Sequence, residues 1–133
     1  LFAVAELELT VRQGALERAL TLAEAAVARA QAGSNLFSEG LAHRYWAEAL
    51  AALDPPHLDE AKAHLATSRE MLETGGVLPE AARTHVSLAR LLIQHGDPER
   101  ARAHFEAAAA TFEVCGLQAE ASRTRSQLTD LGR

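Results

Sequence analysis

Apolar residues recur at intervals of three and four along almost the whole chain, the spacing that places side chains on one face of an α-helix. Glycine and proline residues interrupt this pattern at the joints where one helix ends and the next begins. No segment alternates apolar and polar residues as a β-strand does. The pattern therefore predicts seven helices, over residues 2–13, 15–32, 37–53, 57–74, 79–95, 98–115 and 118–131.

The second, fourth and sixth of these helices repeat one pattern of small and bulky residues. Its anchor alanines, Ala19, Ala61 and Ala101, are separated by 42 and then 40 residues. A period of this size indicates stacked helical hairpins, each of which buries its apolar face against a neighbour. The predicted buried faces are Ala19, Ala23, Ala26 and Ala30, then Ala61, Leu65, Ser68 and Leu72, then Ala101, Phe105, Ala108 and Phe112.

The expected organisation is a single all-α domain of about seven antiparallel helices. Its repeats cover about 1–34, 35–76 and 77–116, and a closing helix lies in 117–133. A solenoid needs such a helix at its end to cover the last hairpin. We expect Leu128 and Leu131 to make that contact, with Arg125 and Asp130 pointing outward.

Two local features refine the helix boundaries. Asp97 stands before Pro98, where an aspartate N-cap and a first-turn proline are both favourable. Gly40 is the one glycine expected inside a helix, in the first turn of a helix that begins near Asn35 or Ser38.

Composition adds limits on size and class. With 133 residues and 48% apolar content, the chain can form the core of one soluble globular domain. Its formal net charge is −5, the excess of acids lies in the first half, and no cluster of lysine and arginine forms a basic stripe. Direct binding to nucleic acid is therefore disfavoured. Because the chain begins at Leu1 and its only methionine is Met71, we expect a segment of a larger protein.

Neither a membrane span nor a disulfide is expected. Apolar runs such as 107–110 are far shorter than the roughly 20 residues that a spanning helix needs. The one cysteine, Cys115, cannot form an intrachain disulfide, and its position suits a small buried residue on an apolar helix face. These features favour a reducing, cytoplasmic location.

The residues that could carry chemistry do not form a known catalytic or metal-binding motif. The six histidines include no pair at i and i+4 and have no partner cysteines, so no metal site is expected. His64 and His104 occupy equivalent positions of two repeats, which is typical of a scaffold position. The chain also lacks a phosphate-binding glycine-rich loop and a nucleophile elbow. We therefore expect neither an enzyme nor a cofactor.

The third repeat carries Leu88-Ala89, Leu92, Gly96-Asp97, Ala101, Phe105 and Ala108 in succession. This order of small and bulky residues resembles the tetratricopeptide repeat, and the resemblance covers nearly the whole chain. It implies a right-handed α–α superhelix. Repeats of 40 to 42 residues look like those of kinesin light chains and of large bacterial signalling and transcription regulators. The alanine- and arginine-rich sequence of residues 96–131 is more similar to the bacterial proteins.

By the same resemblance, the first helix of each pair lines a concave groove that receives a peptide, a protein partner or a neighbouring domain. The groove residues implied are Arg44, Tyr45, Glu48, Arg83, Ser87, Arg90, Gln94, Arg123 and Gln127. Arginine and tyrosine make directional contacts to peptide carboxylates. The simpler alternative is that Arg90 and Glu48 only pair with each other. Trp46 is expected in the core.

The most favoured function is thus a regulatory protein-interaction module. Two other functions stay open. A small-molecule sensor would need a buried cluster of unpaired polar groups around Tyr45, Arg83 and Arg90. A homotypic assembly module, and hence a homo-oligomer, would use exposed hairpin ends, especially where Leu1, Phe2 and Val4 lack a preceding repeat.

Overall fold

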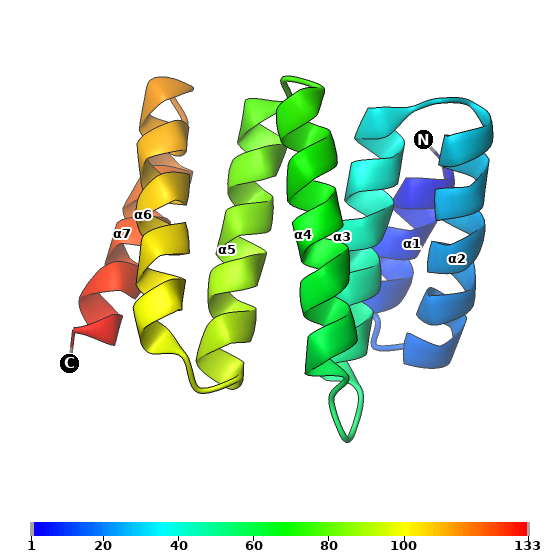
Figure 1. Cartoon of the computed structure of the whole chain (residues 1–133), viewed down its shortest axis with the longest axis horizontal. Coiled ribbons are helices and arrows are strands. Elements are labelled where there is room, and N and C mark those ends of the chain that lie inside the picture. The colour runs from blue at the N-terminus through cyan, green and yellow to red at the C-terminus, as the bar shows by residue number, and fades with distance from the viewer. Residues whose placement is uncertain (1, 133) are drawn as a thin grey trace. The chain divides into compact units, whose positions relative to one another are not determined.

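The computed structural model describes residues 2–132, and all of the regular structure in this part of the chain is α-helical. Within residues 2–132, seven helices follow one another (Figure 1). Their bounds are α1 Phe2–Arg12, α2 Leu16–Ala32, α3 Leu36–Ala52, α4 Leu58–Thr74, α5 Leu78–Gln94, α6 Pro98–Val114 and α7 Gln118–Leu131. Each lies within one residue of its predicted bounds, so the predicted all-α class is confirmed.

The helices group into two compact units. The N-terminal unit, residues 1–76, contains α1 to α4, and the C-terminal unit, residues 77–133, contains α5 to α7. In each unit, helices that are consecutive in sequence pack against each other, and α1 also packs against α3. The division falls between Gly76 and Val77.

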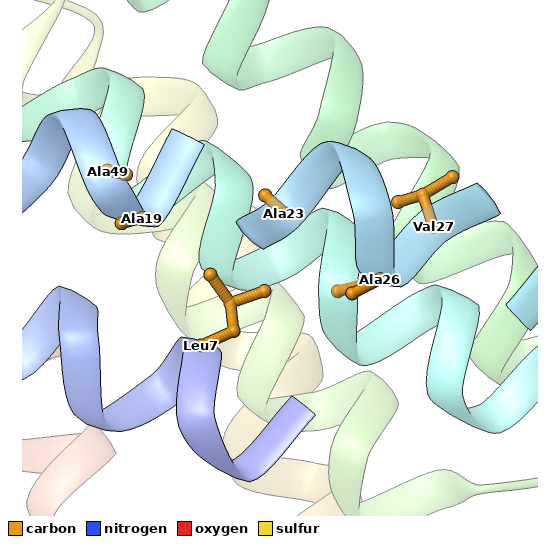
Figure 2. Close-up of a cluster of buried hydrophobic side chains, with 7 residues drawn as sticks. Leu7, Ala19, Ala23, Ala26, Val27 and Ala49 are labelled. Carbon is orange, nitrogen blue, oxygen red and sulfur yellow. The ribbon is translucent and has the colours of Figure 1, made fainter. Parts of the chain in front are cut away.

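The predicted buried faces of α2, α4 and α6 are confirmed, since all twelve of their residues are buried. In the N-terminal unit, Ala19, Ala23 and Ala26 of α2 form a core with Leu7 of α1 and Ala49 of α3 (Figure 2). Alanine leaves room for the backbones of neighbouring helices to approach closely, so three helices can share this core.

The core of the C-terminal unit uses larger side chains. Phe105 and Phe112 of α6 are almost fully buried, at 1% exposure each. Leu128 and Leu131 of α7 pack against the cluster that contains Phe105, as expected of the closing helix. Arg125 and Asp130 are exposed, also as expected.

The helix ends follow the local signals in the sequence. The Asp97 side chain accepts a hydrogen bond from the Arg100 backbone N–H at 3.2 Å, and Asn35 accepts one from Ser38 at 3.0 Å. Both side chains satisfy amides that have no partner within the helix. Cys115 differs from its prediction, because it caps the C-terminus of α6 and is only half-buried.

Gly40 lies inside α3, just after its first turn, because α4 passes very close to it. A Cβ atom at this position would lie 2.7 Å from Cγ of the buried Leu72. The Ser68 hydroxyl of α4 donates a hydrogen bond to the Gly40 carbonyl at 2.7 Å. The small residue therefore sets how closely α3 and α4 pack.

Candidate functional site

Three of the predicted groove residues, Arg44, Tyr45 and Glu48, lie close together on α3. Arg44 is buried, and its Nη2 donates to the Tyr45 hydroxyl at 3.5 Å. The Arg44 guanidinium carbon also lies 5.2 Å from the centre of the Tyr45 ring. Burial raises the pKa of the half-buried Tyr45 phenol, so it stays a neutral donor. Glu48 is exposed on the same helix.

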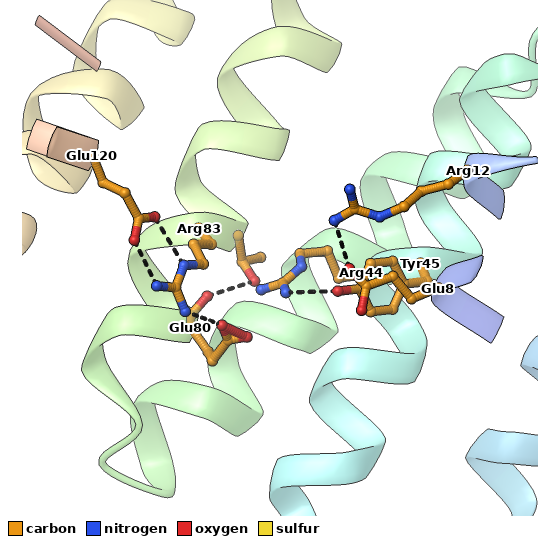
Figure 3. A network of polar contacts seen from close by, with 8 residues as sticks. Glu8, Arg12, Arg44, Tyr45, Glu80, Arg83 and Glu120 are labelled. Atoms are coloured by element: carbon orange, nitrogen blue, oxygen red, sulfur yellow. Dashed lines mark hydrogen bonds and ion pairs between the residues drawn. The ribbon is translucent and has the colours of Figure 1, made fainter. Parts of the chain in front are cut away.

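In the C-terminal unit, Arg83 of α5 joins two helices through carboxylates (Figure 3). Its Nε and Nη2 donate to the two carboxylate oxygens of Glu120 on α7, at 2.9 and 2.6 Å. Its Nη1 donates to Glu80, one turn earlier on α5. These hydrogen bonds raise the pKa of the guanidinium, and the one to Glu120 has the largest effect. Arg83 thus already holds two carboxylates of its own unit.

The other predicted groove residues of this unit lie on α5 and α7. The exposed Arg90 donates from Nε to Oε1 of the half-buried Gln127 at 3.2 Å. Ser87 is half-buried, and Gln94 and Arg123 are exposed. Arg90 and Gln127 thus contact each other, and Arg90 and Arg123 are charged donors exposed on α5 and α7.

Two pairs of histidines that the sequence did not predict join helices within each unit. Nδ1 of His43 on α3 lies 2.9 Å from Nδ1 of His64 on α4. In the C-terminal unit, Nδ1 of His85 on α5 lies 2.9 Å from Nδ1 of His104 on α6. The signal was present in the sequence, because His43 and His85 are 42 residues apart and His64 and His104 are 40 apart, the period of the anchor alanines.

Aromatic stacking surrounds the first of these pairs. The Trp46 and His64 ring centres are 4.1 Å apart, with an angle of 23° between the planes. Trp46 also stacks on His43 at 6.1 Å and packs against the hydrophobic core, although it is only half-buried. Burial lowers the pKa of both histidines, and the nearby His43 lowers that of His64 further. Neutral imidazoles are therefore favoured at this pair.

Other kinds of site find little support in residues 2–132. No cluster of three or more histidine, cysteine or acidic side chains is arranged to hold a metal ion among these residues. No described helix is long and apolar enough to cross a membrane. A shallow cleft between α1 and α2 shares no residue with the predicted groove. It is lined by Ala3, Glu6, Leu22, Ala25, Ala26 and Arg29.

Successive helical hairpins with small-residue interfaces and polar outer faces define a helical-repeat protein of the interaction-scaffold class. The sequence comparison narrows this class. Residues 16–132 match the family described as SNAP, soluble NSF attachment protein, and the chain belongs to this family. The family is an α–α solenoid, in agreement with the predicted class.

The remaining comparisons add no closer relative. No curated protein matched the sequence, and no solved structure matched it either. The resemblance to tetratricopeptide repeats is thus confirmed at the level of helical-repeat proteins, whereas the family that matches is SNAP.

Proposed function

We propose that this chain is a protein-interaction scaffold whose partner binds the groove-lining surface of α5 and α7, which carries the residues assigned to the concave groove. The family match over residues 16–132 is the observation that carries the proposal, because proteins of the SNAP family act as scaffolds for protein partners. The family name describes attachment to NSF, which makes NSF the first partner to test.

The contacts of the C-terminal unit favour some of the predicted residues over others. Arg83 is engaged by Glu80 and Glu120, so its role is to hold α5 against α7. Arg90 and Arg123 are exposed on these two helices and can donate charge-assisted hydrogen bonds to a partner's carboxylates. Arg90 makes one neutral hydrogen bond, to Gln127, which a carboxylate can replace at little cost.

The same proposal includes the wider role expected from the sequence, a regulatory module of a larger bacterial signalling protein in the cytoplasm. The alanine- and arginine-rich sequence of residues 96–131 supports this regulatory role. A partner bound on α5 and α7 would pass its presence to an effector domain elsewhere in such a protein.

The two alternative functions find less support in the contacts. A small-molecule sensor needs buried, unpaired polar groups, whereas Arg83 is paired and Arg90 is exposed. For homotypic assembly, Val4 is already buried, at 7% exposure, within the N-terminal unit. Leu1 and the Phe2 side chain, also named for that role, lie outside the residues described.

The test compares capture of purified NSF, and of proteins from a native lysate, by the immobilised chain and by an Arg90→Ala/Arg123→Ala variant. We expect the variant to lose at least tenfold in affinity for the captured protein, since it lacks two charge-assisted contacts. The matched control is Arg18→Ala/Arg100→Ala, which removes two exposed arginines from α2 and α6. Equal capture by all three proteins, with equal helicity by circular dichroism, would exclude α5 and α7 as the binding surface.

A further inference from the structure

Each histidine pair joins the two helices of one hairpin through the same two atoms. The ring centres are 5.1 Å apart in both pairs, and both Nδ1–Nδ1 distances are 2.9 Å. The pairs therefore repeat with the hairpin, once in each unit. Two imidazole nitrogens at this distance share a single proton, because one must donate and the other must accept.

In the first pair, the surrounding groups indicate which nitrogen accepts. Nε2 of His43 lies 3.5 Å from Oε2 of Glu39, one turn earlier on α3. Glu39 is itself buried and accepts a hydrogen bond from Gln31 of α2 at 3.1 Å. A carboxylate beside Nε2 favours the tautomer of His43 with its proton on Nε2. The lone pair of His43 Nδ1 then points toward His64.

This arrangement is the one found around metal-ligating histidines. Such a histidine donates its outer N–H to a carboxylate, which orients the ring and makes the other nitrogen a better ligand. Here Glu39 occupies that outer position, and Gln31 holds Glu39. A simple helix-to-helix hydrogen bond does not need either group.

We propose that His43 and His64 bind a late divalent transition-metal ion through their Nδ1 atoms, and that His85 and His104 form a second site with the same pair of ligand atoms. Among the first-row ions, Cu²⁺ binds such nitrogen ligands most tightly, ahead of Ni²⁺ and Zn²⁺. Water molecules complete the coordination, which makes the bound ion exchangeable.

The geometry needs only a small adjustment. Cu²⁺ favours square-planar or tetragonal coordination, in which neighbouring nitrogens lie about 90° apart around the ion. With metal–nitrogen bonds of about 2.0–2.1 Å, two such nitrogens are about 2.9 Å from each other. This matches the 2.9 Å between the two Nδ1 atoms, so the rings keep their separation and rotate until both lone pairs point at the ion. On metal binding, the proton on His64 Nδ1 leaves to solvent and Nε2 takes up another, so the ring stays neutral and no net proton is released. The half-buried position of His64 leaves room for this exchange.

The protein contains a reporter for the first site. Trp46 is the only tryptophan in the chain, and its ring stacks on His64 with 4.1 Å between centres. A paramagnetic ion on His64 Nδ1 would lie close to the indole and quench its fluorescence. Trp46 stacks on both histidines of the first pair, whereas the second pair lies in the C-terminal unit, and substitutions in each pair show which one holds the quenching ion.

The experiment titrates CuCl₂ into the untagged full chain in a weakly coordinating buffer near neutral pH. A Cys115→Ser background removes the thiol as a competing ligand. Trp46 fluorescence measures occupancy of the first site, and calorimetry measures the number of ions bound. We expect quenching that saturates with one ion, and about two ions per chain in total.

Substitutions then assign each site. His64→Asn keeps a side-chain donor near the position of Nδ1 but should lose at least tenfold in affinity for the quenching ion, since it removes one of two ligands. Glu39→Gln should lower the affinity for the same ion by about 10–100-fold, the usual effect of losing the carboxylate that orients a ligating histidine. His104→Asn should leave the quenching unchanged and reduce the number of ions by one. The matched control is His95→Gln, an exposed histidine outside both pairs.

The proposal would be overturned if His64→Asn and the wild-type chain reached half-maximal quenching at the same Cu²⁺ concentration. A number of ions that falls equally on His95→Gln and on His104→Asn would also overturn it. Where His64→Asn loses helicity, Glu39→Gln decides, because it changes neither ligand: unchanged affinity there would mean that the pair is only a hydrogen bond between helices.

Discussion

Replacing Gly40 by alanine should destabilise the N-terminal unit, although alanine is the better helix former. The new Cβ would lie 2.7 Å from Cγ and 2.9 Å from Cδ2 of Leu72. Non-bonded carbons prefer about 3.5–4.0 Å, so these contacts are repulsive. Leu72 has 0% exposure, and the nearest atom is its branch carbon rather than a terminal methyl group. The side chain therefore cannot move aside without shifting α4 from α3.

Two opposing terms set the magnitude. Overpacking a core costs about 1–3 kcal/mol, and the very short contacts place Gly40→Ala near the upper end. Alanine gains about 1 kcal/mol over glycine inside a helix. We therefore expect the free energy of unfolding to fall by about 2 kcal/mol.

Urea denaturation followed by Trp46 fluorescence measures this loss, since Trp46 of α3 reports on the N-terminal unit. The control is the same substitution in a Leu72→Ala background, where the clash is absent. There Gly40→Ala should stabilise the unit by about 1 kcal/mol. A stabilising effect in the wild-type background, or an equal effect in both backgrounds, would refute the close-approach explanation.

Three further predictions address the other contacts. Because burial lowers the pKa of His43 and His64 below 6.5, the unfolded chain binds more protons than the folded chain as the pH falls through 6.5. In urea titrations the free energy of unfolding should therefore be highest above pH 6.5 and decrease below it. An equally steep decrease in His64→Asn would mean that the histidine pair does not cause it. Asp97→Ala should cost about 1 kcal/mol in thermal denaturation, and Asp97→Asn much less; equal losses would exclude the cap hydrogen bond. A double-mutant cycle between Arg83 and Glu120 should give a coupling of up to about 1 kcal/mol, since Arg83 is partly exposed, and the coupling should shrink in high salt; zero coupling in low salt would mean that the pair does not hold α5 to α7.

How much of the candidate site was predictable depends on where its contacts come from. The repeat register assigned Arg90 and Gln127 to the same predicted groove, but it predicted neither their contact nor the pairing of Arg83 with Glu120. In both contacts the partners are 37 residues apart, and no local pattern in the sequence reveals such a pair. The histidine pairs were missed for a similar reason. A spacing rule for ligands on one helix cannot detect two histidines that face each other from two helices.

The sequence by itself determined the helices, their ends and their buried faces. These depend on the 3.6-residue period, on glycine and proline at the joints, and on caps such as Asp97, all of which act within a few residues. Only the tertiary structure decided how Gly40 meets Leu72 and which atoms of His43 and His64 face each other. Those outcomes depend on the distance and rotation between packed helices, which the side chains of both helices set together.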